Sequence, residues 1–249
     1  MRTNILITGA SSGLGAEMAR QFAAKGHQLA LCARRVERLE ELKAEIEAAH
    51  PDVRVALRAL DVNDHSTVFA VFRSLAEELG GLDRVIVNAG VGKGARIGTG
   101  GFDANRETAQ TNFVAALAQC EAAVEIFREA GDGHLVVISS MSAMRGMPST
   151  MTVYAASKAG LAALAEGIRS DLLRSPIKVT TLFPGYIRTE MNERVAQQVR
   201  LMVDREPGVR AMVEAIDKEV ATAAVPGWPW KPIGFVLRHA PLKVVRKLV

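Results

Sequence analysis

Two alternating patterns of hydrophobic positions run along the chain. Short runs of consecutive apolar residues predict buried strands, which we place at residues 4–8, 28–33, 53–60, 84–87, 134–139, 178–183 and 222–225. Between them, apolar residues recur every three to four positions, which predicts helices at residues 13–25, 36–50, 66–79, about 103–130 and about 152–173. Strands that alternate with helices are typical of βαβ units. The pattern therefore predicts an α/β fold built on one doubly wound parallel sheet with helices on both faces.

The predicted strands are almost wholly apolar, as in Val85-Ile86-Val87. A parallel sheet covered on both faces requires such strands, because neither face meets water. A chain of 249 residues can form one α/β domain of ordinary size. We assign residues 1–225 to this domain and residues 226–249 to a basic extension that contains Trp and Pro.

A glycine-rich segment joins the first predicted strand to the first predicted helix. Its sequence, TGASSGLG over residues 8–15, follows a strand and opens a helix, which is the context that a dinucleotide-binding turn needs. Glycine permits a tight turn and close approach of the backbone, and the helix N-terminus offers unpaired N–H groups to a pyrophosphate. The candidate binding residues here are Gly9, Ser11, Ser12, Gly13, Leu14 and Gly15.

The end of the second predicted strand indicates which dinucleotide binds. An NAD site places Asp or Glu there to hold the ribose 2′-hydroxyl, whereas an NADP site uses arginine for the 2′-phosphate. This strand is followed by Arg34 and Arg35, and the first acidic residue is Glu37. The guanidinium fork suits a phosphate group, so we predict NADP(H), with Arg34 as the nearer candidate. The alternative is that both arginines simply begin a solvated helix.

Tyr154 and Lys158 have the spacing Y-x-x-x-K, which puts both side chains on one face of a helix. Tyrosine has a reference pKa of about 10, and moving it to about 7 requires about 4 kcal/mol of preferential stabilisation of the phenolate. A lysine one turn away can supply much of this free energy. Taken alone, the spacing also fits an exposed Tyr–Lys pair with no function.

The combination of motifs resembles the short-chain dehydrogenase/reductase family. The matching segments, in the family's order over about residues 3–191, are Thr8–Gly15, Asp61-Val62, Asn88-Ala89-Gly90, Asn112, Ile138-Ser139-Ser140, Tyr154–Lys158 and Pro184-Gly185 with Thr189. The resemblance implies a single-domain Rossmann-type fold, an oxidoreductase that acts on alcohol and carbonyl groups, and a homodimer or homotetramer.

The resemblance also implies a role for each catalytic residue. Tyr154 is the general acid in reduction, and Lys158 lowers its pKa and holds the nicotinamide ribose. Ser140 donates a hydrogen bond to the substrate oxygen, and Asn112 kinks its helix and holds a water molecule. The remaining cofactor contacts that the family implies are Asp61 and Val62 at the adenine, Asn88, Ala89 and Gly90 at the inner ribose, and Pro184, Gly185, Ile187 and Thr189 near the nicotinamide.

The serine departs from the family's spacing. The position thirteen residues before Tyr154 is Met141, whose thioether cannot donate a hydrogen bond. Ser140 lies one residue further away, which implies one extra residue in the loop at 149–153, and Ser142 is the alternative donor.

Composition and charge exclude several classes of protein. Cys32 and Cys120 have neither disulfide nor metal-ligand spacing, and two buried free thiols in a reducing cytosol are expected. We see no signal peptide and no apolar run of about 18–20 residues, so a cytoplasmic location is expected. The net charge is +4, and no basic patch with interleaved aromatic residues indicates nucleic-acid binding.

The substrate loops and the extension leave alternatives open. Methionines at positions 141, 144, 147, 151, 191 and 202 favour an apolar, perhaps lipid-derived ketone or aldehyde, or else ordinary core packing. The extension has no acidic residue and five basic ones, so it favours peripheral contact with a membrane, a cover over the pocket, or a subunit contact. A catalytically idle NADPH-binding protein is the alternative to an enzyme, and the Tyr154–Lys158 pair argues against it.

Overall fold

A seven-stranded parallel sheet forms the centre of the molecule. The computed structural model describes residues 2–190, 192 and 201–248. The strand order is β3-β2-β1-β4-β5-β6-β7, and every neighbouring pair is parallel. The strands are β1 (Asn4–Thr8), β2 (Gln28–Ala33), β3 (Val55–Ala59), β4 (Arg84–Val87), β5 (His134–Ile138), β6 (Lys178–Pro184) and β7 (Thr222–Val225). The predicted α/β class and parallel sheet are therefore confirmed.

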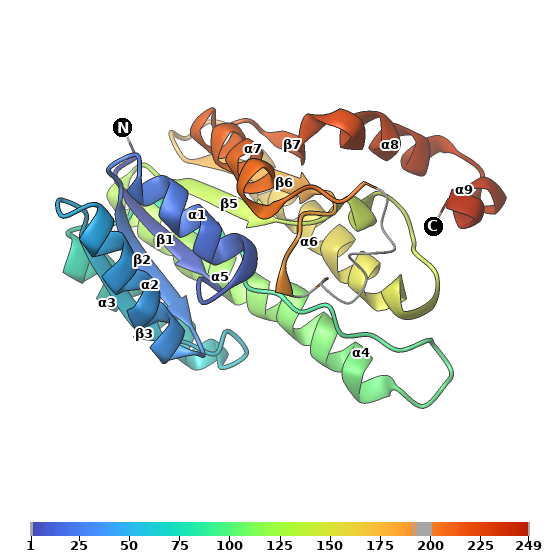
Figure 1. The fold of residues 1–249 in the computed structure, drawn as a ribbon, viewed down its shortest axis with the longest axis horizontal. Coiled ribbons are helices and arrows are strands. Elements are labelled where there is room, and N and C mark those ends of the chain that lie inside the picture. Colours follow the sequence, from blue (N-terminus) through green and yellow to red (C-terminus); the bar gives the residue numbers. More distant parts are fainter. Residues whose placement is uncertain (1, 191, 193–200, 249) are drawn as a thin grey trace.

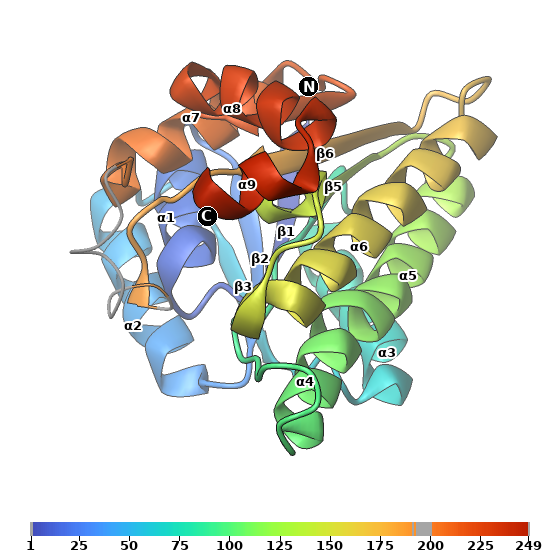
Figure 2. The same cartoon turned by 90° about the vertical axis from the view of Figure 1, so that its right-hand side faces the viewer.

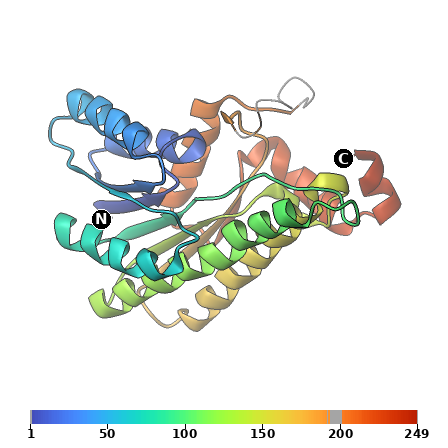
Figure 3. The same cartoon turned by 90° about the horizontal axis from the view of Figure 1, so that it is seen from below.

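Helices cover both faces of this sheet (Figures 1 and 3). One face carries α1 (Gly13–Ala23), α2 (Val36–Ala49) and α7 (Arg205–Asp217), and the other carries α3 (His65–Leu79), α5 (Ala115–Ala130) and α6 (Thr152–Asp171). Each layer has its own apolar core. Phe22 and Ile46 are buried in the first, and Phe72 and Phe127 in the second. This double cover explains why the central strands contain few polar residues.

Two predicted elements differ from the structure. The helix expected over about 103–130 is divided into α4 (Phe102–Ala109), a π-helical turn η1 (Gln110–Val114) and α5. The strand expected from residue 53 begins at Val55, because the amide of Val53 donates to the carbonyl of His50 and closes a turn after α2. Both differences arise from hydrogen bonds that the hydrophobic pattern does not encode.

The C-terminal extension leaves the sheet after β7 and forms α8 (Gly227–His239) and α9 (Leu242–Leu248). Helix α8 packs against the short helix η2 (Met141–Met144). In Figure 2, α9 lies in front of the sheet on the side that faces the viewer. Leu237 of α8 and Val245 of α9 are buried with Met147 and Ala155 of the body. The extension is thus packed on the end of the molecule that carries Tyr154.

The structure also tests the expectations about the cysteines and about helices that could span a membrane. Cys32 and Cys120 are buried free thiols, as predicted, and burial raises the pKa of each to about 12. Among the described residues, no group of three or more His, Cys, Asp or Glu side chains could hold a metal ion. Within residues 2–190, 192 and 201–248, no helix is both long and apolar enough to cross a bilayer.

A buried histidine joins the amino-terminal ends of β4, β5 and β6. The Nε of Arg84 donates to Nδ1 of His134 at 2.9 Å, and Nε2 of His134 lies 2.8 Å from Oγ1 of Thr180. The Thr180 hydroxyl itself donates to the carbonyl of Val220. The ring is therefore neutral with its proton on Nε2. Burial, together with the Arg84 charge, lowers the pKa of His134 to about 2.

His134→Gln should flatten the acid side of the stability profile. Between pH 6.5 and pH 4.5 the unfolded chain binds a proton on His134 that the folded chain does not bind, so stability falls as pH falls. The wild-type protein should lose about 2–3 kcal/mol from this group across that range, and the neutral glutamine variant should not. Urea unfolding of both proteins at several pH values measures the difference. If the free energies of unfolding of the two proteins fell equally with pH, His134 would have to be protonated in the folded state as well.

Candidate functional site

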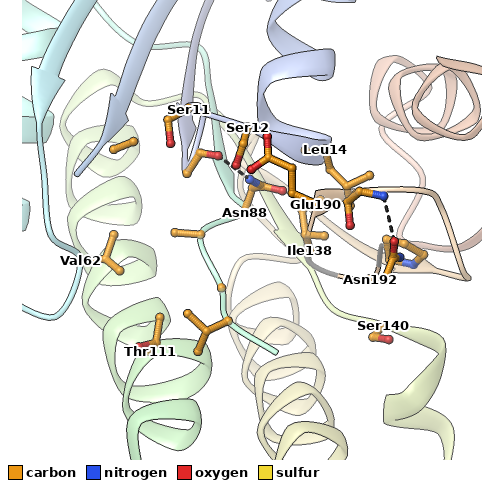
Figure 4. A pocket seen from close by; sticks show the side chains of 18 of the residues that line it. Ser11, Ser12, Leu14, Val62, Asn88, Thr111, Ile138, Ser140, Glu190 and Asn192 are labelled. Carbon is orange, nitrogen blue, oxygen red and sulfur yellow. Dashed lines mark hydrogen bonds between the residues drawn. The ribbon is translucent and has the colours of Figure 1, made fainter. Parts of the chain in front are cut away.

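A cleft opens at the carboxyl-terminal edge of the sheet. Its floor lies at the ends of the neighbouring strands β1 and β4. From there the chain continues toward one side of the sheet after β1 and toward the other side after β4. Doubly wound sheets bind ligands at such switch points. Figure 4 shows Ser11, Ser12 and Asn88 close together in the cleft, and Ser140 further along it.

The glycine-rich turn is close-packed against the loop after β4. Gly9 and Gly13 have φ angles of +65° and +58°, in the left-handed region. A Cβ on Gly9 would lie 2.9 Å from Cα of Ala89, and one on Gly15 would lie 2.5 Å from the carbonyl oxygen of Gly9. The N-terminus of α1 therefore lies at the cleft, and no side chain caps it. This cradle fits a pyrophosphate.

Thr8 and Asn88 tie the first strand to the fourth behind this turn. The Thr8 hydroxyl accepts hydrogen bonds from the amides of Asn88 and Ala89 at 3.0 and 3.1 Å. In return, Nδ2 of Asn88 donates to the Thr8 carbonyl at 2.9 Å. These bonds fix the separation of the two strand ends, and with it the width of the cleft.

Arginines at the start of α2 lie over the serines of the turn. The Arg35 guanidinium donates to the Ser12 hydroxyl at 2.7 Å and to the Ser11 hydroxyl at 3.3 Å. Arg34 is exposed and also lines the cleft. A phosphate bound here would meet two guanidinium groups and two hydroxyls, which is the chemistry expected for a ribose 2′-phosphate.

The predicted site residues come together with two exceptions. Gly15 and Asn112 do not line the cleft: Gly15 lies behind the turn against Asn88, and Asn112 lies behind Gly90. The predicted residues that line the cleft are Gly9, Ser11, Ser12, Gly13, Leu14, Arg34, Arg35, Asp61, Val62, Asn88, Ala89, Gly90, Ser140, Tyr154, Lys158, Pro184, Gly185, Ile187 and Thr189.

Asn112 and Lys158 converge on Gly90 from two helices. In the π-helical turn η1, Asn112 exchanges two hydrogen bonds with the backbone of Val91, at 2.8 and 2.9 Å. Lys158 of α6 is buried and donates through Nζ to the Ile138 carbonyl at 2.9 Å. A Cβ on Gly90 would lie 3.1 Å from Oδ1 of Asn112 and 3.4 Å from Nζ of Lys158. The lysine is thus fixed beside the cleft by β5.

Tyr154 and Ser140 both line the inner end of the cleft. Burial raises the pKa of Tyr154 above its ordinary value, the neighbouring Ser140 hydroxyl opposes this, and the nearby Tyr186 adds to it. Burial also lowers the pKa of Lys158 to about 8. The family resemblance implies a lowered tyrosine pKa, whereas the protein alone raises it and keeps the phenol protonated at neutral pH.

Ser140 and Ser142 differ in position. The Ser140 hydroxyl accepts a hydrogen bond from the backbone amide of Ser142 at 3.1 Å, so Ser142 contributes its amide and does not line the cleft. The loop where an extra residue was expected contains a 3-10 turn (Ser149–Met151), in which Ser149 has a left-handed φ of 62°. The geometry therefore favours Ser140 as the donor.

The methionines pack against the extension instead of lining the cleft. Met141 is buried with Phe183 and Trp230, and Met147 is buried with Leu237 and Val245. Met144 and Met151 are partly buried in the same clusters, and Met191 lies outside the described residues. Of the two interpretations of these residues, the structure favours packing for Met141 and Met147.

The cleft also contains residues that were not predicted as site residues, among them Glu190 and Asn192. Glu190 lines it and accepts hydrogen bonds from Arg38 at 3.0 and 3.2 Å, and its carboxylate lies 3.7 Å from Arg35. Asn192 also lines it and accepts from the amide of Thr189 at 2.9 Å. Because Arg38 and Glu190 are 152 positions apart, no local pattern could have paired them.

A cleft with a glycine-rich turn at one end and Tyr154, Ser140 and Lys158 at the other is typical of a dinucleotide-type α/β protein. The chain belongs to the short-chain dehydrogenase/reductase family, since the family model described as short chain dehydrogenase matches residues 3–200. An uncharacterized oxidoreductase of Mycobacterium tuberculosis is 53% identical over 246 residues, which cover 99% of this chain and 97% of that protein.

Solved structures agree with this assignment. A short-chain dehydrogenase from Sphingobium yanoikuyae in complex with NADPH has 26% identity and a TM-score of 0.83, covering 98% of this chain and 95% of its own. A short chain dehydrogenase/reductase from Burkholderia phymatum in complex with NAD has 20% identity and a TM-score of 0.86 over the same shares, and it shows the fold alone. The two neighbours bind different dinucleotides.

Gly15→Ala and Gly167→Ala should have opposite effects on stability. Both glycines lie in helices, where alanine gains up to about 1 kcal/mol in helix propensity. A Cβ at Gly167 meets nothing within 4 Å, whereas one at Gly15 meets the Gly9 carbonyl and the Asn88 amide. Thermal unfolding should show that Gly167→Ala stabilises the protein and that Gly15→Ala lowers its free energy of unfolding by about 1–3 kcal/mol. Equal melting temperatures for the two variants would contradict the close packing of the turn.

Proposed function

We propose that this protein is an NADP(H)-dependent oxidoreductase that interconverts a carbonyl and an alcohol, reducing an apolar ketone or aldehyde with Tyr154 as the proton donor. The observation that carries the proposal is the convergence of Tyr154, Ser140 and the buried Lys158 at the inner end of a cleft whose outer end fits a phosphate group. A catalytically idle binding protein would have no need of a tyrosine, a serine and a lysine held in this arrangement.

The cofactor would lie along the cleft with its adenine half toward β2. Arg34 and Arg35 would hold the 2′-phosphate, and the turn before α1 would hold the pyrophosphate. Lys158 and Asn88 would face the inner ribose. When bound, the nicotinamide ring supplies or accepts the hydride.

Tyr154 would give its proton to the carbonyl oxygen in the reductive direction. Its raised pKa keeps the phenol protonated at neutral pH, so the proton is available before reaction. Ser140 would donate a second hydrogen bond to the same oxygen, since its own acceptor site is used by the Ser142 amide. The Lys158 ammonium would stabilise the phenolate that the transfer leaves behind.

The packing behind the Gly185 side of the cleft is apolar. Gly185 lines the cleft and packs against the indole of Trp230, whose ring centroid lies 5.8 Å from that of Tyr186. Met141 and Phe183 are buried with the same indole and do not line the cleft themselves. An apolar layer directly behind Gly185 supports a hydrocarbon group, more than a charged one, beside the reacting carbon.

Substitutions at three hydroxyl groups test the proposal. Tyr154→Phe should remove nearly all turnover in an assay of NADPH oxidation with a hydrophobic ketone, and leave NADPH affinity unchanged, because a proton donor acts on the transition state. Ser140→Ala should lower kcat by on the order of 10²–10³. Ser142→Ala should be mild, because its backbone amide remains. If Tyr154→Phe kept most of its kcat, another group would be the acid and the proposal would fail.

Cofactor selectivity provides a separate test. The protein should bind NADPH at least about tenfold more tightly than NADH, and Arg34→Asp should erase or reverse this preference, because a guanidinium in the 2′-phosphate position is replaced by a carboxylate. Fluorescence titration with both cofactors gives the two dissociation constants. Equal affinities in the unmodified protein would overturn the NADP(H) assignment.

Glu190→Gln is the matched variant for this titration. The Glu190 carboxylate competes with a phosphate for Arg35 and Arg38, so its neutral analogue should tighten NADPH by about fivefold and leave NADH unchanged. If Glu190→Gln instead weakened the binding of both cofactors, Glu190 would stabilise the bound state of either cofactor and would not compete with the phosphate.

A further inference from the structure

The extension after β7 has an inner face that fixes it to the body of the protein. Trp230, Gly234 and Leu237, which recur at helical spacing along α8, are buried. The indole of Trp230 occupies the space above Gly185, where a Cβ would lie 2.0 Å from the ring. The helix is therefore held against the substrate end of the cleft in a defined orientation.

The opposite face of the same segment is apolar and exposed. Trp228 is 80% exposed, Phe235 67% and Leu242 63%, and Val236 and Val244 are also exposed. These five large apolar side chains fall within a stretch of the chain that includes both α8 and α9. Exposed apolar groups gathered on one segment mark an interaction surface.

The charges on this face have a single sign. Lys231, Arg238, Lys243 and Arg246 are all exposed, and the sequence contains no Asp or Glu after Glu219. Within the part of the chain that the structure describes, none of these four cations forms a salt bridge. A partner that supplies negative charge would therefore complement this face.

Apolar and basic side chains alternate along α8. Lys231, Phe235 and Arg238 are separated by four and three positions, so they share one side of the helix. A phenyl ring flanked by two cations matches the layer of a bilayer where phosphates and acyl chains meet. Leu242 and Val244 alternate in the same way with Lys243.

We propose that the outward face of α8 and α9 docks on an anionic lipid surface. Its apolar side chains enter the interfacial layer, and its cations pair with lipid phosphates. A second copy of the chain fits poorly, because a two-fold contact between these faces brings cations against cations. A nucleic acid also fits poorly, because Leu242 and Val244 cannot stack on bases.

Docking in this way brings the substrate end of the cleft within about one helix diameter, roughly 10–12 Å, of the lipid surface. The inner face of α8 contacts Gly185 and Met141, which adjoin the Tyr154 end of the cleft. An apolar substrate that leaves the bilayer would thus have a short path to the cleft. The lipid contact itself does not depend on the proposed reaction, so binding and catalysis can fail independently.

Co-sedimentation of the full chain with sucrose-loaded vesicles tests the docking. The protein should pellet with vesicles of equal phosphatidylglycerol and phosphatidylcholine in 50 mM NaCl, and pellet far less with phosphatidylcholine alone or in 500 mM NaCl. Lys231→Glu with Lys243→Glu should weaken binding by at least about 25-fold, at about fivefold for each cation removed. Trp228 emission should shift to the blue on binding.

Matched variants elsewhere on the surface control for net charge and exposed area. Phe235→Ser should weaken binding, while Phe102→Ser should not, although Phe102 is 71% exposed. Arg54→Glu with Lys178→Glu changes the net charge equally but lies outside the segment, and it should have only a small effect. Circular dichroism and thermal melting confirm that each variant is folded.

Three results would overturn the proposal. The first is that the protein stays in the supernatant with anionic vesicles at low salt. The second is that the control variants weaken binding as much as the segment variants do. The third is that vesicle binding is absent and light scattering shows that Phe235→Ser dissociates an oligomer, which would make a second copy of the chain the occupant of this face.

Discussion

The hydrogen bonds between Thr8 and Asn88 are the constraint on which the rest of the site depends. They hold the carboxyl-terminal ends of β1 and β4 at a fixed separation, behind a turn whose glycines leave no room for a Cβ. Parallel strands all end at one edge of the sheet, so every loop that follows a strand arrives at this cleft. The phosphate cradle and the Tyr154 end of the cleft are two parts of one edge, and a shift at Gly9 would be felt at both.

A second set of contacts fixes the Lys158 end of the cleft. The Ser139 hydroxyl donates to the Lys158 carbonyl at 2.8 Å, and Nζ of Lys158 donates to the Ile138 carbonyl, so the end of β5 and helix α6 hold each other. The π-helical turn at Asn112 adds the backbone of Val91 to this unit. Because these groups are buried, their geometry is maintained without water, and the pKa values of Tyr154 and Lys158 move in the directions that burial requires.

The extension has one face that packs beside the cleft and another that is exposed at the surface. Its inner residues close the substrate side through Trp230 and Gly185, and its outer residues remain apolar and basic. The methionines at 141 and 147 are accounted for by this packing, since they fill the irregular space beneath α8 and α9. The extension is therefore part of the packing behind Gly185, which lines the cleft.

The amino-acid sequence by itself predicted the seven strands, most of the helices up to residue 173, the glycine turn and the Tyr154–Lys158 spacing, because each depends on residues close together in the chain. It predicted neither α7 nor the π-helical turn between α4 and α5. It also placed Arg34 and Arg35 after β2. Only the tertiary structure put Gly15 and Asn112 behind the cleft, chose Ser140 over Ser142 as the cleft residue, and paired Glu190 with Arg38. These outcomes depend on contacts between distant segments and on which side of a loop faces the cleft, and the chain's periodicity carries no information about either.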